Sequence, residues 1–138
     1  MPTSADLLLD TSAALALLRD VDPAHDAANE ATSGAVLGLA GHALIETYSV
    51  LTRLPGSARI RPERVGEILE TVFPSSVALP EPQALRAAQT FINAGIAGGA
   101  VYDGLVGLAA KAAVVTLLSC DRRAEPTYVR LGVDFRMI

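Results

Sequence analysis

Short apolar runs alternate along the chain with longer segments whose apolar residues recur every three or four positions. The short runs, which are typical of buried β-strands, occupy residues 6–9, 35–40, 76–80, 114–119 and 133–138. The longer segments predict helices over residues 12–19, 23–32, 42–54, 62–73, 81–94, 100–113 and 122–132. Because strands and helices alternate, the pattern predicts an α/β fold with a central, mainly parallel sheet and helices on both faces.

Local signals mark where several of these helices begin and end. Asp22 followed by Pro23 is typical of an N-cap and the first helical position, and Pro62 begins another helix in the same way. Gly95 is placed to close the helix over 81–94 as a C-cap. No linker or internal repeat interrupts the alternation, so we expect a single domain over residues 1–138.

The composition narrows the class of protein without indicating an activity. Apolar residues make up 51% of the 138 residues, which is typical of a domain with a large buried core. The single cysteine, Cys120, cannot form an internal disulfide, and the first ten residues lack the basic region and apolar length of a signal peptide. We therefore expect a cytoplasmic protein that does not act on membranes.

The net charge of −4 excludes a general electrostatic attraction to nucleic acid. An enzyme that acts on nucleic acid would need metal ions or local arginines to offset its acidic residues. The positions of the acidic residues along the chain therefore bear on the function.

Four acidic residues interrupt the apolar pattern. Asp10 directly follows the apolar run 6–9, and Asp121 lies two residues after the run 114–119. Glu46 and Asp103 interrupt helical segments that otherwise consist largely of apolar or small residues. Because sites in open parallel sheets form beyond the carboxyl ends of the strands, we expect the four carboxylates to converge there.

Converging carboxylates would repel one another, and their pKa values would rise unless a cation joined them. Hard oxygen ligands without a cysteine or histidine cluster favour Mg²⁺ or Mn²⁺ over zinc. One or two such ions can activate water and stabilise the leaving oxygen in phosphodiester hydrolysis. On this interpretation the metal ligands and catalytic residues are Asp10, Glu46, Asp103 and Asp121.

Each of these acids also has an ordinary structural explanation, and the pattern alone leaves both open. Asp10 can cap the helix that begins near Ser12, and Asp103 can complement a helix dipole. Glu46 can lie on a solvated helix face, and Asp121 can be a turn residue.

Four segments of the chain, in the same order, resemble a known family. They are "LLLDTSAALALL" (7–18), "HALIETYSVLTRLPG" (42–56), "YDGLVGLAA" (102–110) and "LLSCDRRAEPTYVRLGVDF" (117–135). In these segments the chain resembles the PIN-domain ribonucleases, specifically the VapC-type toxins of bacterial type II toxin–antitoxin modules. The resemblance implies a three-layer α/β/α PIN domain and Mg²⁺- or Mn²⁺-dependent endonucleolytic cleavage of RNA. It also implies inhibition by a cognate VapB-like antitoxin and a homodimer of the toxin.

The resemblance carries the four acids over as the site residues and adds two hydroxyl groups. Ser12 and Ser119 occupy positions near the first and the last acid, where a hydroxyl can orient metal-bound water or a carboxylate. Ser119 stands where threonine is frequent in the family, and "YDGLVG" is more glycine-rich than usual. Neither departure removes a carboxylate.

Arginines near these segments are candidate contacts for RNA phosphates. Arg53, Arg59 and Arg61 surround the loop "RLPGSARIR", and Arg122 follows the fourth acid. A solvated basic loop explains the first three equally well.

Three other functions compete with the ribonuclease hypothesis. A phosphatase of the haloacid dehalogenase type needs a second aspartate where Ser12 lies. A receiver domain needs a lysine after the last core strand, but the only lysine, Lys111, precedes that strand. The remaining alternative is a PIN-like module that binds RNA or protein without cleaving, and the complete set of four acids argues against it.

Overall fold

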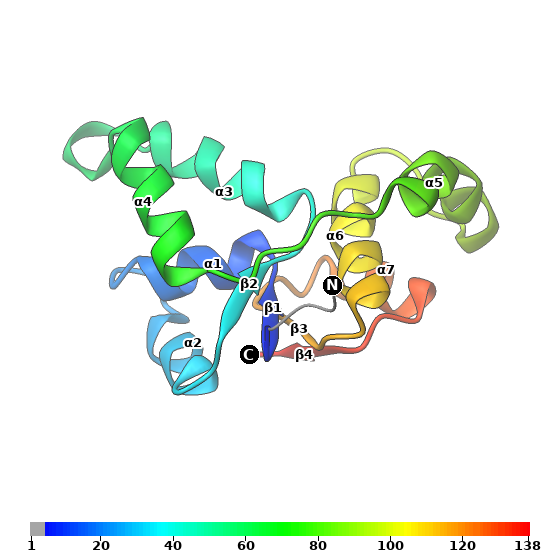
Figure 1. The fold of residues 1–138 in the computed structure, drawn as a ribbon, viewed down its shortest axis with the longest axis horizontal. Coiled ribbons are helices and arrows are strands. Elements are labelled where there is room, and N and C mark those ends of the chain that lie inside the picture. Colours follow the sequence, from blue (N-terminus) through cyan, green and yellow to red (C-terminus); the bar gives the residue numbers. More distant parts are fainter. Residues whose placement is uncertain (1–4) are drawn as a thin grey trace.

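A parallel β-sheet forms the centre of the protein in the computed structural model, which describes residues 5–138 (Figure 1). Its strands are β1 (Leu7–Leu9), β2 (Leu37–Leu39), β3 (Leu117–Ser119) and β4 (Phe135–Met137). They lie in the order β2-β1-β3-β4, and every neighbouring pair is parallel. The parallel sheet predicted from the sequence is therefore confirmed. Residues 1–4, part of the stretch that lacks the features of a signal peptide, lie outside the described residues.

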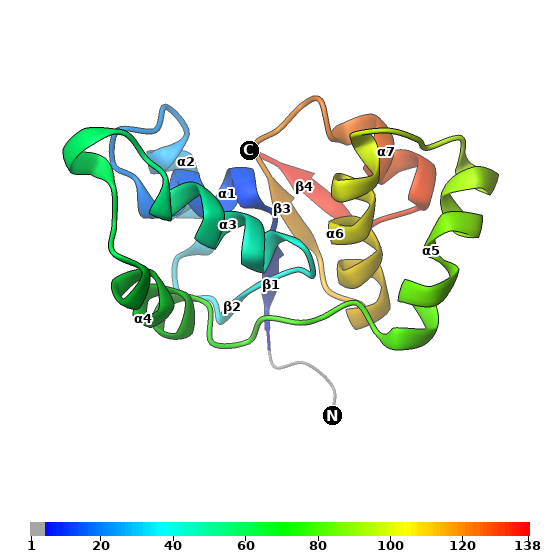
Figure 2. The ribbon, with the colours of Figure 1, turned by 90° about the horizontal axis from the view of Figure 1, so that it is seen from above.

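Helices cover both faces of this sheet. They are α1 (Thr11–Leu18), α2 (His25–Thr32), α3 (Ala43–Thr52), α4 (Pro62–Val72), α5 (Glu81–Ala94), α6 (Ala100–Ala113) and α7 (Glu125–Leu131), with a 3₁₀ turn η1 (Gly56–Ala58). Helices α1 to α4 lie on one side of the sheet and α5 to α7 on the other (Figure 2). This is the three-layer α/β/α arrangement expected from the sequence. Among the described residues, no helix combines the length and the apolar character that crossing a bilayer requires.

The core lies where the central strands meet the flanking helices. The leucines of β1 and β3 that are fully buried are Leu8, Leu9, Leu117 and Leu118. Burying one leucine side chain stabilises a fold by roughly 1.5–3 kcal/mol. Small side chains let the helices approach closely, as at Ala13 and Ala14 on α1 and Ala109 and Ala110 on α6, all of which are buried. The central strands are thus held rigidly, and their carboxyl ends are fixed in place.

The run at 76–80 does not form the strand that its apolar residues predict. Val77 forms an isolated bridge to Ala40 beside β2, and just before it the Ser75 amide donates to the Leu37 carbonyl at 3.0 Å. The Ser76 hydroxyl, rather than a backbone carbonyl, accepts the hydrogen bond from the Leu39 amide at 2.9 Å. A side chain therefore replaces part of the ladder, and a regular strand does not form.

Several element boundaries also differ from the prediction, and two of these differences have a clear local cause. The second helix begins at His25 because the Asp22 carboxylate accepts from the Ala24 amide at 2.9 Å and closes a turn around Pro23. The last central strand begins only at Leu117 because Val114 adopts a left-handed conformation (φ 57°) and ends α6. In both cases a local turn replaces residues that the hydrophobic pattern assigned to a regular element.

Candidate active site

Four carboxylates line one pocket of about 200 Å³ beyond the carboxyl ends of β1 and β3. Asp10 follows β1, Asp121 follows β3, Glu46 lies in the first turn of α3, and Asp103 lies in the first turn of α6. The pocket is completed by Thr11, Ser12, Leu15, Val50 and Val106. The structure thus brings together all four acids that the sequence indicated, while their roles as ligands stay predictions.

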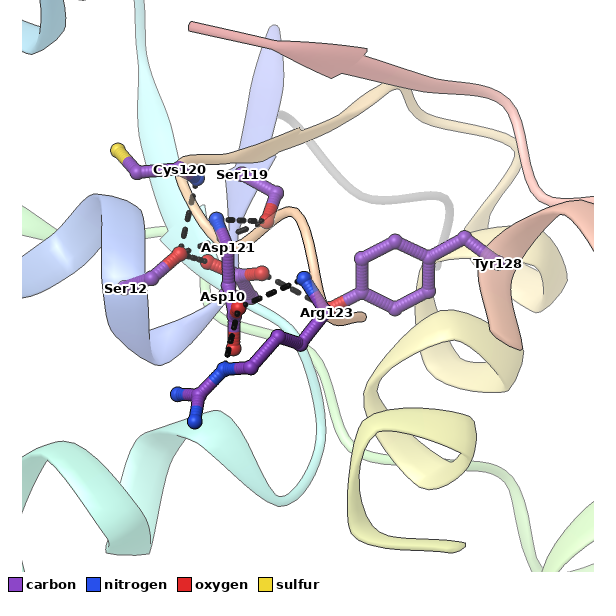
Figure 3. Close-up of polar contacts among 7 residues, drawn as sticks. All are labelled: Asp10, Ser12, Ser119, Cys120, Asp121, Arg123 and Tyr128. Carbon is purple, nitrogen blue, oxygen red and sulfur yellow. Dashed lines mark hydrogen bonds and ion pairs between the residues drawn. The ribbon is translucent and has the colours of Figure 1, made fainter. Parts of the chain in front are cut away.

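The Asp10 carboxylate is the most firmly held of the four (Figure 3). The strand ladder continues into Asp10, whose amide donates to the Leu118 carbonyl at 3.2 Å, and α1 begins at the next residue. Its Oδ1 accepts from the Ser12 hydroxyl at 2.6 Å and from the Ala13 amide at 3.0 Å. Its Oδ2 accepts from the Tyr128 hydroxyl at 2.8 Å. Asp10 is therefore the N-cap of α1 and a member of the pocket at once.

The two predicted hydroxyl residues connect the end of β1 to the end of β3. The Ser12 hydroxyl, which donates to Asp10, accepts from the Cys120 amide at 2.9 Å. The buried Ser119 hydroxyl accepts from the Asp121 amide at 3.1 Å. The two hydroxyl oxygens lie 3.4 Å apart. These contacts fix the loop that carries Asp121 relative to the start of α1 (Figure 3).

Asp121 and Glu46 are held more loosely than Asp10. The Asp121 carboxylate accepts from the amide of Arg123 at 3.0 Å and lies 3.4 Å from its Nε. The Arg123 side chain is 94% exposed, so solvent screens this ion pair. Glu46 lies 3.7 Å from His42 Nε2, and its side chain is 41% exposed. Both carboxylates are therefore more exposed than that of Asp10, which is 4% exposed.

The four carboxylates of the pocket interact electrostatically, and this changes the pKa of Asp103. Burial, together with the charges of Asp121, Asp10 and Glu46, raises the pKa of Asp103 to about 6, and the charge of Arg123 partly opposes this shift. Burial and the neighbouring Asp10 carboxylate raise the pKa of Tyr128 far above its ordinary value. The phenol therefore stays protonated and acts as a hydrogen-bond donor. A cation in the pocket would relieve the repulsion at Asp103.

The donor atoms suit Mg²⁺ or Mn²⁺, although they do not form a closed cage. Within residues 5–138, no group of three or more His, Cys, Asp or Glu side chains is arranged as a ready set of metal ligands. Mg²⁺ usually keeps several waters and binds one or two carboxylates directly, so it does not need such a cage. The pocket offers carboxylate and hydroxyl oxygens and an excess of negative charge. These residues fit a hydrated divalent ion.

The structure adds two residues that the sequence pattern did not single out. Tyr128 is fully buried on α7, and its hydroxyl contacts Asp10. The sequence signal that could have found Tyr128 was a tyrosine in a short helix that begins a few residues after Asp121. Thr11 lines the pocket with a buried hydroxyl oxygen that has no hydrogen-bond partner among residues 5–138.

The predicted RNA-contacting arginines lie outside the pocket lining. Their side chains are exposed at Arg53, Arg59, Arg61 and Arg122. Arg59 Nε donates to the Leu54 carbonyl at 3.1 Å and so stays close to its own loop. Their contact with RNA stays a prediction.

Comparison with known proteins places these features in a family. The family model described as the PIN domain matches residues 7–128. The chain is 39% identical to Ribonuclease VapC27 of Mycobacterium tuberculosis, over 92% of this chain and 93% of that protein. It is also 39% identical to Ribonuclease VapC40 of the same species, over 94% and 96% of the two chains. Among solved structures, M. tuberculosis VapC20, described as a sarcin-ricin loop cleaving toxin, superposes with a TM-score of 0.66. The superposition covers 86% of this chain and 92% of VapC20, at 20% identity.

Proposed function

The chain belongs to the PIN domain family, and from this premise we propose that it is a Mg²⁺- or Mn²⁺-dependent endoribonuclease that acts as a toxin. One observation carries the proposal. Carboxylates from four separate elements line a single pocket, in a chain that is 39% identical to a ribonuclease over 92% of its length. The raised pKa of Asp103 supports it, because a pocket of mutually repelling acids attracts a divalent cation.

The residues of the pocket have distinct tasks in this proposal. Asp10, Glu46, Asp103 and Asp121 would hold the ion. When bound, the ion would activate water for attack on phosphorus and stabilise the leaving oxygen. Ser12 and Ser119 keep the Asp10 and Asp121 segments together. The proposed contacts for the RNA backbone are the exposed arginines after Asp121 and along the segment between α3 and α4: Arg53, Arg59, Arg61 and Arg122.

Cleavage of RNA by the purified chain tests this function. We expect cleavage with Mg²⁺ or Mn²⁺ and none with a chelator. Asp103→Asn should lower the rate by about 100-fold or more, because it removes a negative charge and a ligand oxygen. Asp134→Asn is the matched control, since this exposed aspartate contacts Thr116 outside the pocket. Cleavage that persists in chelator, or in Asp103→Asn at the wild-type rate, would contradict the proposal.

The proposed partner is a small VapB-like antitoxin. An arginine from such a partner would displace the ion by pairing with the pocket carboxylates, since guanidinium groups bind carboxylates through paired hydrogen bonds. We also propose that two copies of the toxin pair, and that the protein meets its RNA in the cytoplasm. Light scattering of the free chain measures the copy number. A toxin–antitoxin complex that cleaves RNA as fast as the free chain would contradict occlusion of the pocket.

A non-cleaving PIN-like module remains the second candidate. The observation that favours it is that, among the described residues, no three potential ligands form a ready metal cage. The same cleavage assay separates the two functions, because a binding module would retain RNA on a filter without shortening it.

A further inference from the structure

Tyr128 places a buried hydroxyl directly on a site carboxylate. The residue lies on α7 and is fully buried, yet its hydroxyl donates to Asp10 Oδ2 at 2.8 Å. The two residues are 118 positions apart in the chain. A buried hydroxyl needs a hydrogen-bond partner, and the partner here is the site carboxylate.

The Tyr128 ring is packed firmly enough to hold that hydroxyl in place. Its centroid lies 5.6 Å from that of Phe135 on β4. The ring also lies against α6 at Gly107, where an added Cβ would come within 3.2 Å of Tyr128 Cδ1. Gly107 lies about one helical turn after Asp103. The Tyr128 ring therefore contacts the helix that carries Asp103, while its hydroxyl contacts Asp10 at the end of β1, and the size of the ring sets the distance between them.

Three hydrogen-bond donors hold the Asp10 carboxylate in one orientation and leave one of its oxygens able to bind an ion. Oδ1 accepts two hydrogen bonds, from Ser12 and from the Ala13 amide, and Oδ2 accepts one, from Tyr128. Each carboxylate oxygen has two lone pairs, so Oδ2 keeps one that is not engaged by these donors. The three donors also prevent rotation of the carboxylate, which lowers the entropy that ion binding must remove.

We propose that Tyr128 is a positioning residue that fixes the Asp10 carboxylate and its spacing from Asp103 for binding of the divalent ion. This inference rests on the proposed function, because it assumes that the pocket binds Mg²⁺ or Mn²⁺. Tyr128 acts through Asp10 and does not itself contact the ion or the RNA.

Tyr128→Phe tests this role, because it removes the hydroxyl and keeps the ring. We expect the Kd for Mn²⁺, measured by calorimetry without RNA, to rise about tenfold, as is typical when a group that supports a metal ligand is lost. RNA cleavage at limiting Mn²⁺ should fall by a similar factor and recover as Mn²⁺ is raised. Recovery by added metal distinguishes positioning from a general loss of structure.

Two control variants separate this effect from stability alone. Thr116→Val also removes a hydroxyl that donates to a carboxylate, that of Asp134 at 2.7 Å, but at an exposed position outside the pocket. Phe135→Leu loosens the ring cluster around Tyr128 and keeps the hydroxyl. Both should bind Mn²⁺ with a Kd within about twofold of the wild type, well short of the tenfold change expected on loss of a supporting group.

The outcomes distinguish this inference from the proposed function. If the wild type cleaves RNA with Mn²⁺ but Tyr128→Phe has the wild-type Kd, the positioning role is wrong and the function stands. If Phe135→Leu raises the Kd as much as Tyr128→Phe, packing explains the effect and the role of the hydroxyl is wrong. If the wild type binds no Mn²⁺ and cleaves nothing, the proposed function fails, and this inference fails with it.

A measurement on the wild-type hydroxyl covers the case in which Tyr128→Phe does not fold. With ¹³C at the tyrosine Cζ atoms, the Tyr128 resonance can be assigned by elimination using Tyr48→Phe and Tyr102→Phe. We expect it to shift on addition of Mg²⁺, because the ion draws charge from the carboxylate that accepts the phenol proton. An unchanged Tyr128 resonance, at a Mg²⁺ concentration that raises the melting temperature, would overturn the proposal.

Discussion

Asp10 and Glu46 bring the same functional group to the same pocket, but the protein holds them in different ways. Asp10 is 4% exposed, and its two oxygens accept three hydrogen bonds. The Glu46 side chain is 41% exposed, and its carboxylate lies 3.7 Å from His42 Nε2. Asp10 follows a strand that is buried on both sides, whereas Glu46 extends from a helix at the rim. One side of the pocket is therefore preorganised, and the other can adjust to a ligand.

Alanine substitution of Asp10 and of Glu46 should have the largest and most different effects on stability. Asp10→Ala leaves the Tyr128 and Ser12 hydroxyls and the Ala13 amide without their acceptor and removes the cap of α1. We expect the free energy of unfolding to fall by about 2–4 kcal/mol. Glu46→Ala should change it by less than about 0.5 kcal/mol, because its side chain is partly exposed. Both should abolish RNA cleavage, and urea unfolding in chelator measures the difference. Equal stability losses would show that the two sides of the pocket are held alike.

A bound ion should link the Asp10 side of the pocket to the Glu46 side. We expect its effect on the free energy of unfolding to be the second largest, after that of Asp10→Ala. At a Mn²⁺ concentration a hundredfold above the Kd, the wild type should gain about 2.7 kcal/mol, because the ion binds only the folded pocket. Asp103→Asn should be more stable than the wild type in chelator, since one repelling charge is gone, and should gain less from Mn²⁺. Thermal melts with chelator and with Mn²⁺ measure both effects. A variant that is less stable in chelator and keeps the full gain would make Asp103 a structural acid.

The pH dependence of stability reports on the electrostatic environment of Asp103. Its pKa is raised from 3.8 to about 6, so the folded protein binds this proton more tightly than the unfolded chain does. The stability that follows is fully present below about pH 4 and is lost as the pH rises through about 6. In chelator, the stability of the wild type relative to Asp103→Asn should therefore fall between pH 4 and pH 7. Unfolding curves across this range test the sign, and a constant difference would contradict the raised pKa.

We expect the smallest change in stability from loss of the exposed ion pair between Arg123 and Asp121. Arg123→Ala removes the ion pair to Asp121, and because the arginine is 94% exposed we expect less than about 1 kcal/mol of lost stability. The same change should raise the pKa of Asp103 further, since Arg123 lowers it. A two-dimensional NMR titration of the aspartate carboxyl carbons follows that pKa. A fall in the Asp103 pKa in Arg123→Ala would reverse the assigned electrostatic role.

Much of the fold was predictable because its signals are local. The apolar runs that became β1 and β3 and the amphipathic segments that became α3 to α6 follow from hydrophobic period and flanking Pro or Gly residues. The prediction failed at residues 76–80, where the apolar run is as strand-like as the others. There the Ser76 hydroxyl takes the place of a backbone acceptor, and hydrophobic period carries no information about such a contact.

The sequence alone indicated which acids could form a site, because Asp10 directly follows, and Asp121 lies two residues after, an apolar run that predicts a buried strand. Only the tertiary structure decided how each acid is held. The neighbouring positions of β1 and β3 bring Ser12 to the Cys120 amide, and the packing of α7 on α6 brings Tyr128 to Asp10. These hydrogen bonds join residues more than one hundred positions apart, so they exist only after the strand order and the helix packing are set. Hydrophobic period reports the burial of one segment at a time, and it cannot specify which buried groups will meet.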